Sequence, residues 1–247
     1  MYEKRIIPTL LLNDGSLVKT TRFKKPVHVG DPCNTVRIFN EIGVDEILLL
    51  DIGKRKQNKM GPDFTLLKDI AAEAFIPMAY GGGIQDLNDA STIFRIGFEK
   101  IVLNTLALNN PQIIQEFSAE FGSQAVMVSI DYKTSFFGHK KIFNPYANDI
   151  KCTLREYADC LVEAGAGELL ITNVDREGTW LGLDIAEELA DIPVPVIYSG
   201  GVKGAQDAEM NLLRTDVDAI GVGNTVVFQK RNCGVLINFP FKSYIHA

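Results

Sequence analysis

Two glycine clusters, each followed by an Asn-Thr pair, are the feature of this sequence best suited to binding chemistry. The first cluster, Gly81-Gly82-Gly83, precedes Asn104-Thr105, and the second, Gly200-Gly201, precedes Asn224-Thr225. Matching positions in the two copies lie about 120 residues apart, which indicates a chain built from two similar halves. Glycines let backbone N–H groups approach an anion closely, and a helix that begins after them adds a favourable dipole. The duplication therefore predicts two anion sites for a substrate with phosphate at both ends; the alternative is that these glycines only form tight turns.

The same offset of about 120 residues relates each carboxylate that ends an apolar run to a residue in the other half. Asp131 ends one such run, and the position about 120 residues earlier is Leu11. Asp51 ends another, and its counterpart is Asn173. Acid–base catalysis often needs one group to accept a proton while another donates one. Asp131 and Asp51 are thus the acid–base candidates, and the position that could hold a symmetric second carboxylate holds a leucine, which cannot exchange protons.

Four charged residues stand at the other ends of these runs. They alternate in sign along the chain: Arg5, Glu46, Lys100 and Glu168. Two positive and two negative side chains could close into a ring across one end of a barrel. The alternative is that strand starts are charged simply because they meet water.

These residues need a scaffold that gathers the ends of strands. Apolar runs predict strands at 5–12, 46–51, 76–80, 100–104, 124–131, 168–174, 194–199 and 219–223. Capping and periodicity predict helices at 31–43, 63–74, 86–97, 111–121, 153–164, 184–190 and 205–214. Three segments stand outside this pattern: a long polar loop of functional character at 13–30, an inserted hairpin at 134–150, and a weakly patterned tail at 229–247.

Alternating strands and helices are typical of an α/β fold of the (β/α)8 TIM barrel type. We expect a single domain over 1–247, with half-barrels at about 1–120 and 121–247. The active site of such a barrel lies at the C-terminal ends of the strands, where the glycine clusters and Asn-Thr pairs fall. An open doubly wound sheet is the alternative fold, but neither G-x-G-x-x-G nor G-x-x-x-x-G-K-[ST] occurs in the sequence.

Composition narrows the class of partner. The formal net charge of −6 argues against nucleic acid, and no apolar run approaches the roughly 20 residues that span a bilayer. The N-terminus carries no secretory signal pattern, and the four cysteines form no CxxC pair, so we expect a cytoplasmic protein with reduced thiols. The three histidines are scattered, so no metal site and no cofactor is expected.

Over residues 1–228 the sequence resembles the cyclase subunit of imidazole glycerol phosphate synthase. The motifs that carry the resemblance run along the chain, and they include Lys4-Arg5-Ile6-Ile7-Pro8, Asp14-Gly15, Gly30-Asp31-Pro32, Asp51-Ile52, Gly81-Gly82-Gly83-Ile84, Asn104-Thr105, Phe121-Gly122-Ser123-Gln124, Ile130-Asp131, Asp175-Arg176-Glu177-Gly178-Thr179 and Ser199-Gly200-Gly201.

The resemblance implies a barrel with a glutaminase subunit docked on its N-terminal face. Ammonia would pass a charged gate, formed by Arg5, Glu46, Lys100 and Glu168, and would reach a bisphosphorylated ribulosyl nucleotide at the other end. The resemblance assigns one phosphate to Gly83, Asn104, Thr105 and Gly178, and the other to Gly201, Gly223 and Asn224. It makes Asp131 one of two catalytic carboxylates. It puts Lys19 in a mobile first loop that closes over substrate. Asp51, at the end of the second strand, is a further catalytic candidate.

The sequence departs from the family at the chemical end. The second catalytic carboxylate falls at Leu11, Gly53-Lys54-Arg55 replaces Thr-Ala-Ser, Trp180 replaces a common lysine, and the C-terminal helix is shortened. Losing an acid–base group typically removes about 10²–10⁴-fold in rate.

Three interpretations follow. The favoured one is a paralogue with weakened or lost cyclase activity, which passes ammonia to an acceptor, through a sugar amidotransferase, in the synthesis of surface sugars such as lipopolysaccharide. The second is an active cyclase-lyase of histidine biosynthesis, which makes imidazole glycerol phosphate and aminoimidazole carboxamide ribotide. The third, the sister phosphoribosyl isomerase, is disfavoured because it too would want a carboxylate at position 11 and needs no gate.

Overall fold

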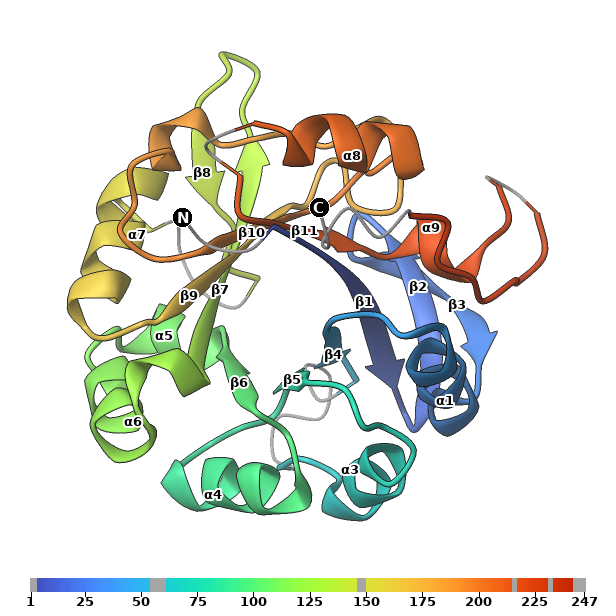
Figure 1. Cartoon of the computed structure of the whole chain (residues 1–247). Helices are drawn as coiled ribbons and strands as arrows, with labels where there is room; N and C mark the ends of the chain where they lie inside the picture. The colour runs from blue at the N-terminus through green and yellow to red at the C-terminus, as the bar shows by residue number, and fades with distance from the viewer. Residues whose placement is uncertain (1–3, 54–60, 146–149, 215–216, 231–232, 242–247) are drawn as a thin grey trace.

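Eight parallel strands close into a barrel, with helices around the outside (Figure 1). The computed structural model describes residues 4–53, 61–145, 150–214, 217–230 and 233–241. In chain order the barrel strands are β1 (Arg5–Asn13), β4 (Ile47–Asp51), β5 (Met78–Gly81), β6 (Lys100–Leu103), β7 (Val126–Thr134), β9 (Glu168–Asn173), β10 (Val196–Ser199) and β11 (Ala219–Val222). Parallel pairing of β11 with β1, from Arg5–Ala219 to Pro8–Val222, closes the ring. The predicted (β/α)8 barrel is therefore confirmed, and the open doubly wound sheet is wrong.

The strands are apolar on both faces because each face packs against a different core. One residue from every barrel strand meets on the barrel axis, and these are Ile7, Leu48, Ala79, Val102, Met127, Leu170, Ile197 and Ala219. The neighbouring positions point outward into the larger core beneath the helices, which includes Tyr80, Phe39 and Phe117. The axial cluster is a packed apolar layer that separates the two ends of the barrel.

The described helices are α1 (Pro32–Ile42), α3 (Phe64–Ala71), α4 (Leu87–Ile96), α5 (Thr105–Asn109), α6 (Ile113–Phe121), α7 (Leu154–Glu163), α8 (Ala205–Leu212) and α9 (Asn224–Val227). Four of them, α1, α3, α4 and α7, begin at a side chain that caps the first turn. The carboxylates of Asp31, Asp63 and Asp86 accept hydrogen bonds from the first turns of α1, α3 and α4. Thr153 and Glu156 form a reciprocal capping box on α7.

The helix predicted at 184–190 is wrong, because that segment forms only a 3₁₀ turn, η2 (Glu187–Leu189). A second 3₁₀ turn, η1 (Ser123–Ala125), precedes β7. The carboxylate of Asp184 does not cap a helix: it accepts hydrogen bonds from the Tyr132 hydroxyl at 2.9 Å and from the Asn173 amide at 2.6 Å. Pro193 and Pro195 follow and stop the turn from continuing.

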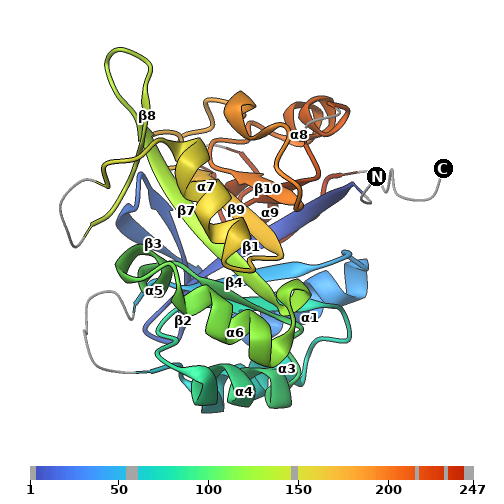
Figure 2. The same ribbon diagram turned by 90° about the vertical axis from the view of Figure 1, so that its left-hand side faces the viewer.

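Two hairpins extend the barrel wall. The polar stretch at 13–30 is not the loop that we predicted, because it forms β2 (Ser16–Thr21) and β3 (Lys24–Gly30). β2 pairs antiparallel with β1, with Leu11 opposite Val18, and its buried residues explain why the stretch is ordered as a strand. The hairpin predicted within 134–150 is confirmed by β8 (Lys140–Ile142), which pairs antiparallel with the end of β7. Figure 2 shows β7 running through the barrel wall into this projecting hairpin.

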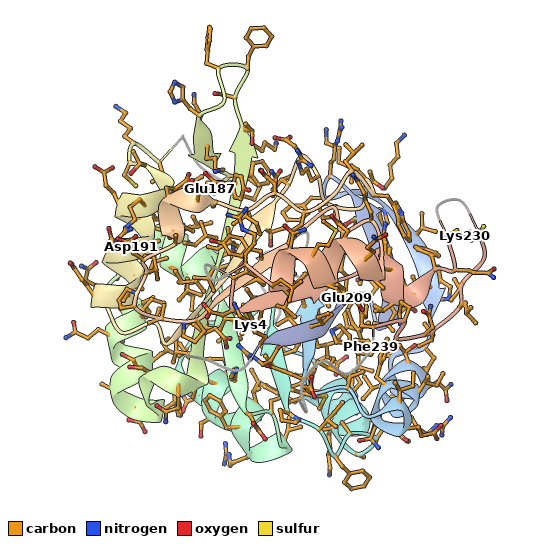
Figure 3. The ribbon with its side chains drawn as sticks, turned by 45° about the horizontal axis from the view of Figure 1, so that its top comes forward. Lys4, Glu187, Asp191, Glu209, Lys230 and Phe239 are labelled. Carbon is orange, nitrogen blue, oxygen red and sulfur yellow. The ribbon has the colours of Figure 1, made fainter. Side chains whose placement is uncertain are left out.

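The tail has no full final helix in its described part. After α9, Phe228 bridges to Val235, and Asn238 donates from its backbone to Val226 at 3.0 Å. Phe239 packs on Phe241 with ring centroids 4.9 Å apart. Figure 3 labels Phe239 of this tail, and it shows the β7–β8 hairpin projecting at the top of the view. No helix in the described ranges is long and apolar enough to cross a membrane.

Candidate functional site

A cavity of about 1170 Å³ opens at the C-terminal ends of the barrel strands. It brings together every candidate predicted for the chemical end of the barrel: Leu11, Lys19, Asp51, Gly83, Asn104, Thr105, Asp131, Gly178, Gly201, Gly223 and Asn224. The four candidates of the charged ring are absent from its wall, because they lie beyond the axial apolar layer. The charged ring and the cavity therefore lie at opposite ends of one barrel.

The glycine clusters adopt matching geometry in the two halves. Gly82 has φ of 130°, and a Cβ there would lie 2.4 Å from the backbone oxygen of Asp51. Gly200 has φ of 101°, and a Cβ there would lie 2.7 Å from the backbone oxygen of Asn173. Asp51 and Asn173 are themselves counterparts at the ends of β4 and β9. Close backbone packing therefore accounts for these two glycines, although both also border the cavity. Gly83 borders the cavity as well and stays a candidate for anion binding.

Asp131 is held from the side by an amide. The residue is 4% exposed, and its carboxylate accepts a hydrogen bond from the Asn104 Nδ2 at 3.2 Å. The same nitrogen donates to the backbone oxygen of Ser129 at 3.0 Å. In the other half, the Asn224 amide donates to the backbone oxygen of Gly178 at 3.1 Å. Both asparagines of the Asn-Thr pairs therefore have structural partners in addition to their predicted role with phosphate.

Lys19 enters the cavity from β2, so its predicted location in a loop is wrong. Its side chain is 5% exposed, and the ammonium donates a hydrogen bond to the backbone oxygen of Thr9. Burial lowers the pKa of Lys19 to about 8, and the Glu177 carboxylate acts in the opposite direction. A Cβ at Gly223 would lie 2.9 Å from the Lys19 Nζ, so the glycine leaves room for the ammonium.

Glu177 fastens the β2–β3 hairpin over the cavity. Its two carboxylate oxygens accept hydrogen bonds from the Thr20 hydroxyl at 2.9 Å and from the backbone N–H of Phe23 at 3.0 Å. The adjacent Gly178 has φ of 71°, and a Cβ there would lie 2.1 Å from the backbone oxygen of Thr20. We did not predict a role for Glu177, although it lies within a motif that carried the resemblance. Trp180, with φ of 62°, also lines the cavity and was singled out only as a departure.

The predicted charged ring lies at the N-terminal ends of the barrel strands, which we call the floor of the barrel. Arg5 forms ion pairs with Glu46 and with Glu168. Lys100 pairs with the same two carboxylates, at 3.1 Å to Glu46 and 2.6 Å to Glu168. The two carboxylates raise the pKa of Arg5 against the opposing effect of burial. The alternative that these charges only meet water is wrong, since each cation contacts both anions.

The comparisons with known proteins place the chain in a family. A family model described as "Histidine biosynthesis protein" matches residues 5–231. This chain belongs to that family. A Pseudomonas aeruginosa protein, provisionally named imidazole glycerol phosphate synthase subunit hisF2, is 42% identical over 244 residues, 97% of each chain.

Two further relatives carry similar names. A Vibrio vulnificus protein, provisionally named subunit hisF3, is 34% identical over 252 residues, which cover 98% of this chain and 95% of the relative. The Helicobacter hepaticus imidazole glycerol phosphate synthase subunit HisF is 39% identical over 210 residues, 83% of this chain and 82% of the relative. The histidine biosynthesis family member described here is therefore of the HisF cyclase type.

Leu11 contributes an apolar side chain to the cavity. It lies opposite Leu50 in the pairing of β1 with β4, and both half-buried leucines border the cavity. The carboxylates in the described wall are Asp51, Asp131 and Glu177. Asp51 accepts a hydrogen bond from the backbone N–H of Gly53 at 3.0 Å, and Glu177 is engaged with the β2–β3 hairpin. Leu11 contributes methyl groups to the cavity wall, and these cannot exchange protons.

Within the described part of the chain, no group of three or more His, Cys, Asp or Glu side chains is placed to hold a metal ion. Asp131, Asp51 and Lys19 are the catalytic candidates with ionisable side chains that border the cavity.

Proposed function

We propose that this chain receives ammonia from a glutaminase docked on the N-terminal face of the barrel and conducts it to an acceptor beyond the C-terminal face. Its own cyclase activity is weakened or lost. The observation that carries the proposal is Leu11: an aliphatic side chain borders the cavity at the position that the family fills with a catalytic carboxylate. Acid–base catalysis often needs one group to accept a proton while another donates one, and Leu11 cannot act as the second group beside Asp131.

The ring on the floor supports the ammonia part of the proposal. Arg5, Glu46, Lys100 and Glu168 keep the end of the barrel closed by four ion pairs at the face assigned to the glutaminase. Above them lies the apolar axial layer, and Val102 and Leu170 of that layer also border the cavity. Neutral ammonia crosses an apolar layer more readily than ammonium, because burial penalises the charged form.

The acceptor in this proposal is a carbohydrate, and the product is an amide or amidine of a bacterial surface sugar. The consuming enzyme would be a sugar amidotransferase. The numbered names hisF2 and hisF3 among the relatives fit chains that occur beside a first HisF subunit, as a paralogue for a second pathway would.

A second candidate function is the active cyclase-lyase of histidine biosynthesis. The observation that favours it is the retained cavity, in which Asp131, Asp51 and Lys19 still lie together with the glycines and Asn-Thr pairs. In this case Asp51 or another group would replace the missing carboxylate.

One assay separates the two candidates. The purified chain is supplied with ammonium and the bisphosphorylated ribulosyl nucleotide, and imidazole glycerol phosphate is measured. We expect little or no product. Turnover comparable to that of an ordinary HisF subunit would refute the proposal and establish the cyclase.

A further inference from the structure

The β7–β8 hairpin grows directly out of the strand that carries Asp131. Tyr132 and Thr134 of β7 pair with Ile142 and Lys140 of β8, immediately beyond the cavity. The backbone N–H of Phe143 returns to the backbone oxygen of Asp131 at 2.7 Å. The hairpin therefore projects from the C-terminal ends of the strands, where the cavity opens, and the charged ring lies at the other end of the barrel. Figure 2 shows the projecting hairpin at β8.

Two phenylalanines occupy the tip of this hairpin. Phe136 is 99% exposed and Phe137 is 83% exposed, and their rings lie edge to face with centroids 5.5 Å apart. A phenylalanine buries about 150–250 Å² when covered, so the pair offers a large apolar area to a partner. Exposed apolar groups that are contiguous mark interaction sites more often than single exposed residues do.

The hairpin is anchored rather than loosely attached. At the tip, the backbone N–H of Ser135 donates to His139 at 2.8 Å, and that of Gly138 donates to Ser135 at 2.9 Å. At the base, Lys140 pairs with Glu188 at 2.7 Å, and the backbone N–H of Thr134 donates to the Asp175 carboxylate at 2.9 Å. An aromatic anchor that is held before binding loses less conformational freedom on binding.

The charge of the hairpin defines the chemistry of the partner. The segment 132–143 contains Lys133, Lys140 and Lys141 and no acidic residue, in a chain with a formal net charge of −6. Lys133 lies over the Phe143 ring at 3.9 Å, whereas Lys141 is exposed. The complementary surface is an apolar pocket with an acidic rim.

We propose that the Phe136–Phe137 tip docks the enzyme that consumes the ammonia. This inference rests on the proposed function. Ammonia that leaves the cavity into water is protonated and lost from transfer, so the acceptor enzyme must cover the mouth, and the hairpin is the apolar projection beside that mouth. The glutaminase is assigned to the far end, which leaves this end for the acceptor.

The first test is site-specific photo-cross-linking in cells that express the full complex. The probe, p-benzoylphenylalanine, replaces Phe136, and the matched control carries it at Phe75. Phe75 is 89% exposed and lies just before the start of β5, at the opposite end of the barrel. We expect position 136, and not 75, to capture an acidic enzyme that aminates a carbohydrate. Capture of a second copy of this chain, or of the same proteins at both positions, would overturn the inference.

The second test measures transfer with the captured enzyme. The double variant Phe136→Ser, Phe137→Ser is expected to bind it about 30-fold or more weakly, as for paired hot-spot residues. Glutamine-dependent amination falls in the double variant, whereas amination supported by added ammonium is retained. The control Met210→Ser, at an exposed methionine of α8, matches the wild type. Unchanged glutamine-dependent amination in the double variant would refute the docking site alone. Failure of the wild-type complex to transfer ammonia would refute the proposed function, and the docking site with it.

Discussion

The ammonium of Lys19 donates a hydrogen bond to the backbone oxygen of Thr9, so a side chain of the outer hairpin is inserted into the barrel. The two residues lie on antiparallel neighbours, β2 and β1, and both border the cavity. Glu177 fastens the same hairpin from the other side through Thr20 and Phe23. The β2–β3 hairpin is therefore held on one side by β1, at the cavity, and on the other by the segment after β9.

Burial of Lys19 predicts a pH-dependent stability. Its pKa falls from the ordinary 10.5 to about 8 in the folded chain, so between these values the unfolded chain binds more protons. The free energy of unfolding contributed by this group is therefore lowest below pH 8 and rises as the pH increases toward 10.5. Each pKa unit corresponds to about 1.36 kcal/mol, so the rise from about pH 8 to 10.5 is about 3–4 kcal/mol at most. Urea unfolding of wild type and Lys19→Met should show this rise only in the wild type; an equal rise in both would contradict the assignment.

Breaking the charged ring on the floor is predicted to lower both the stability of the chain and the transfer of ammonia. Arg5→Ala leaves the almost fully buried Glu46 and Glu168 with Lys100 as their remaining ion-pair partner among the described residues. Removing one member of a buried ion pair costs about 3–5 kcal/mol, and we expect the lower end because Lys100 still contacts both carboxylates. In the glutaminase complex, less of the glutamine nitrogen should reach the acceptor. Arg37→Ala, at an exposed arginine outside the ring, is the control; unchanged transfer in Arg5→Ala would count against the gate.

The substitution Gly178→Ala is predicted to loosen the β2–β3 hairpin. An alanine Cβ would lie 2.1 Å from the Thr20 backbone oxygen, and φ of 71° disfavours any side chain. The strained backbone alone costs about 1–3 kcal/mol. Gly178→Ala should therefore speed limited proteolysis within 16–30. Gly30→Ala is the control, since its Cβ would meet nothing within 4 Å, and equal proteolysis of the two variants would show that Gly178 does not hold the hairpin.

The barrel and most candidate residues could be predicted because they depend on strand order alone. Strands buried on both faces read as continuous apolar runs, and parallel strands bring all their C-terminal ends to one side. Asp131 and Asn104 were therefore predicted at the same end of the barrel because both end strands, and Arg5 and Glu46 at the other end because both begin strands.

The contacts made by segments outside the repeat could not be predicted. The stretch at 13–30 is polar because β3 is largely exposed, so its pattern resembled a loop. The role of Glu177 depends on where β2 passes, which no local pattern specifies. A helix was predicted to begin at Asp184, but the side chain of Asp184 is bound by Tyr132 of β7 and Asn173 of β9.

The most direct measurement compares cyclisation by wild type, Leu11→Asp and Leu50→Asp, each supplied with ammonium and the bisphosphorylated nucleotide. Leu50 lies opposite Leu11 across the β1–β4 pair and borders the same cavity, so its variant introduces a carboxylate at a matched but different position. The account predicts that Leu11→Asp raises kcat/KM by about 10²-fold or more, as expected for a restored acid–base group, and that Leu50→Asp does not. A wild-type rate equal to that of Leu11→Asp would contradict it.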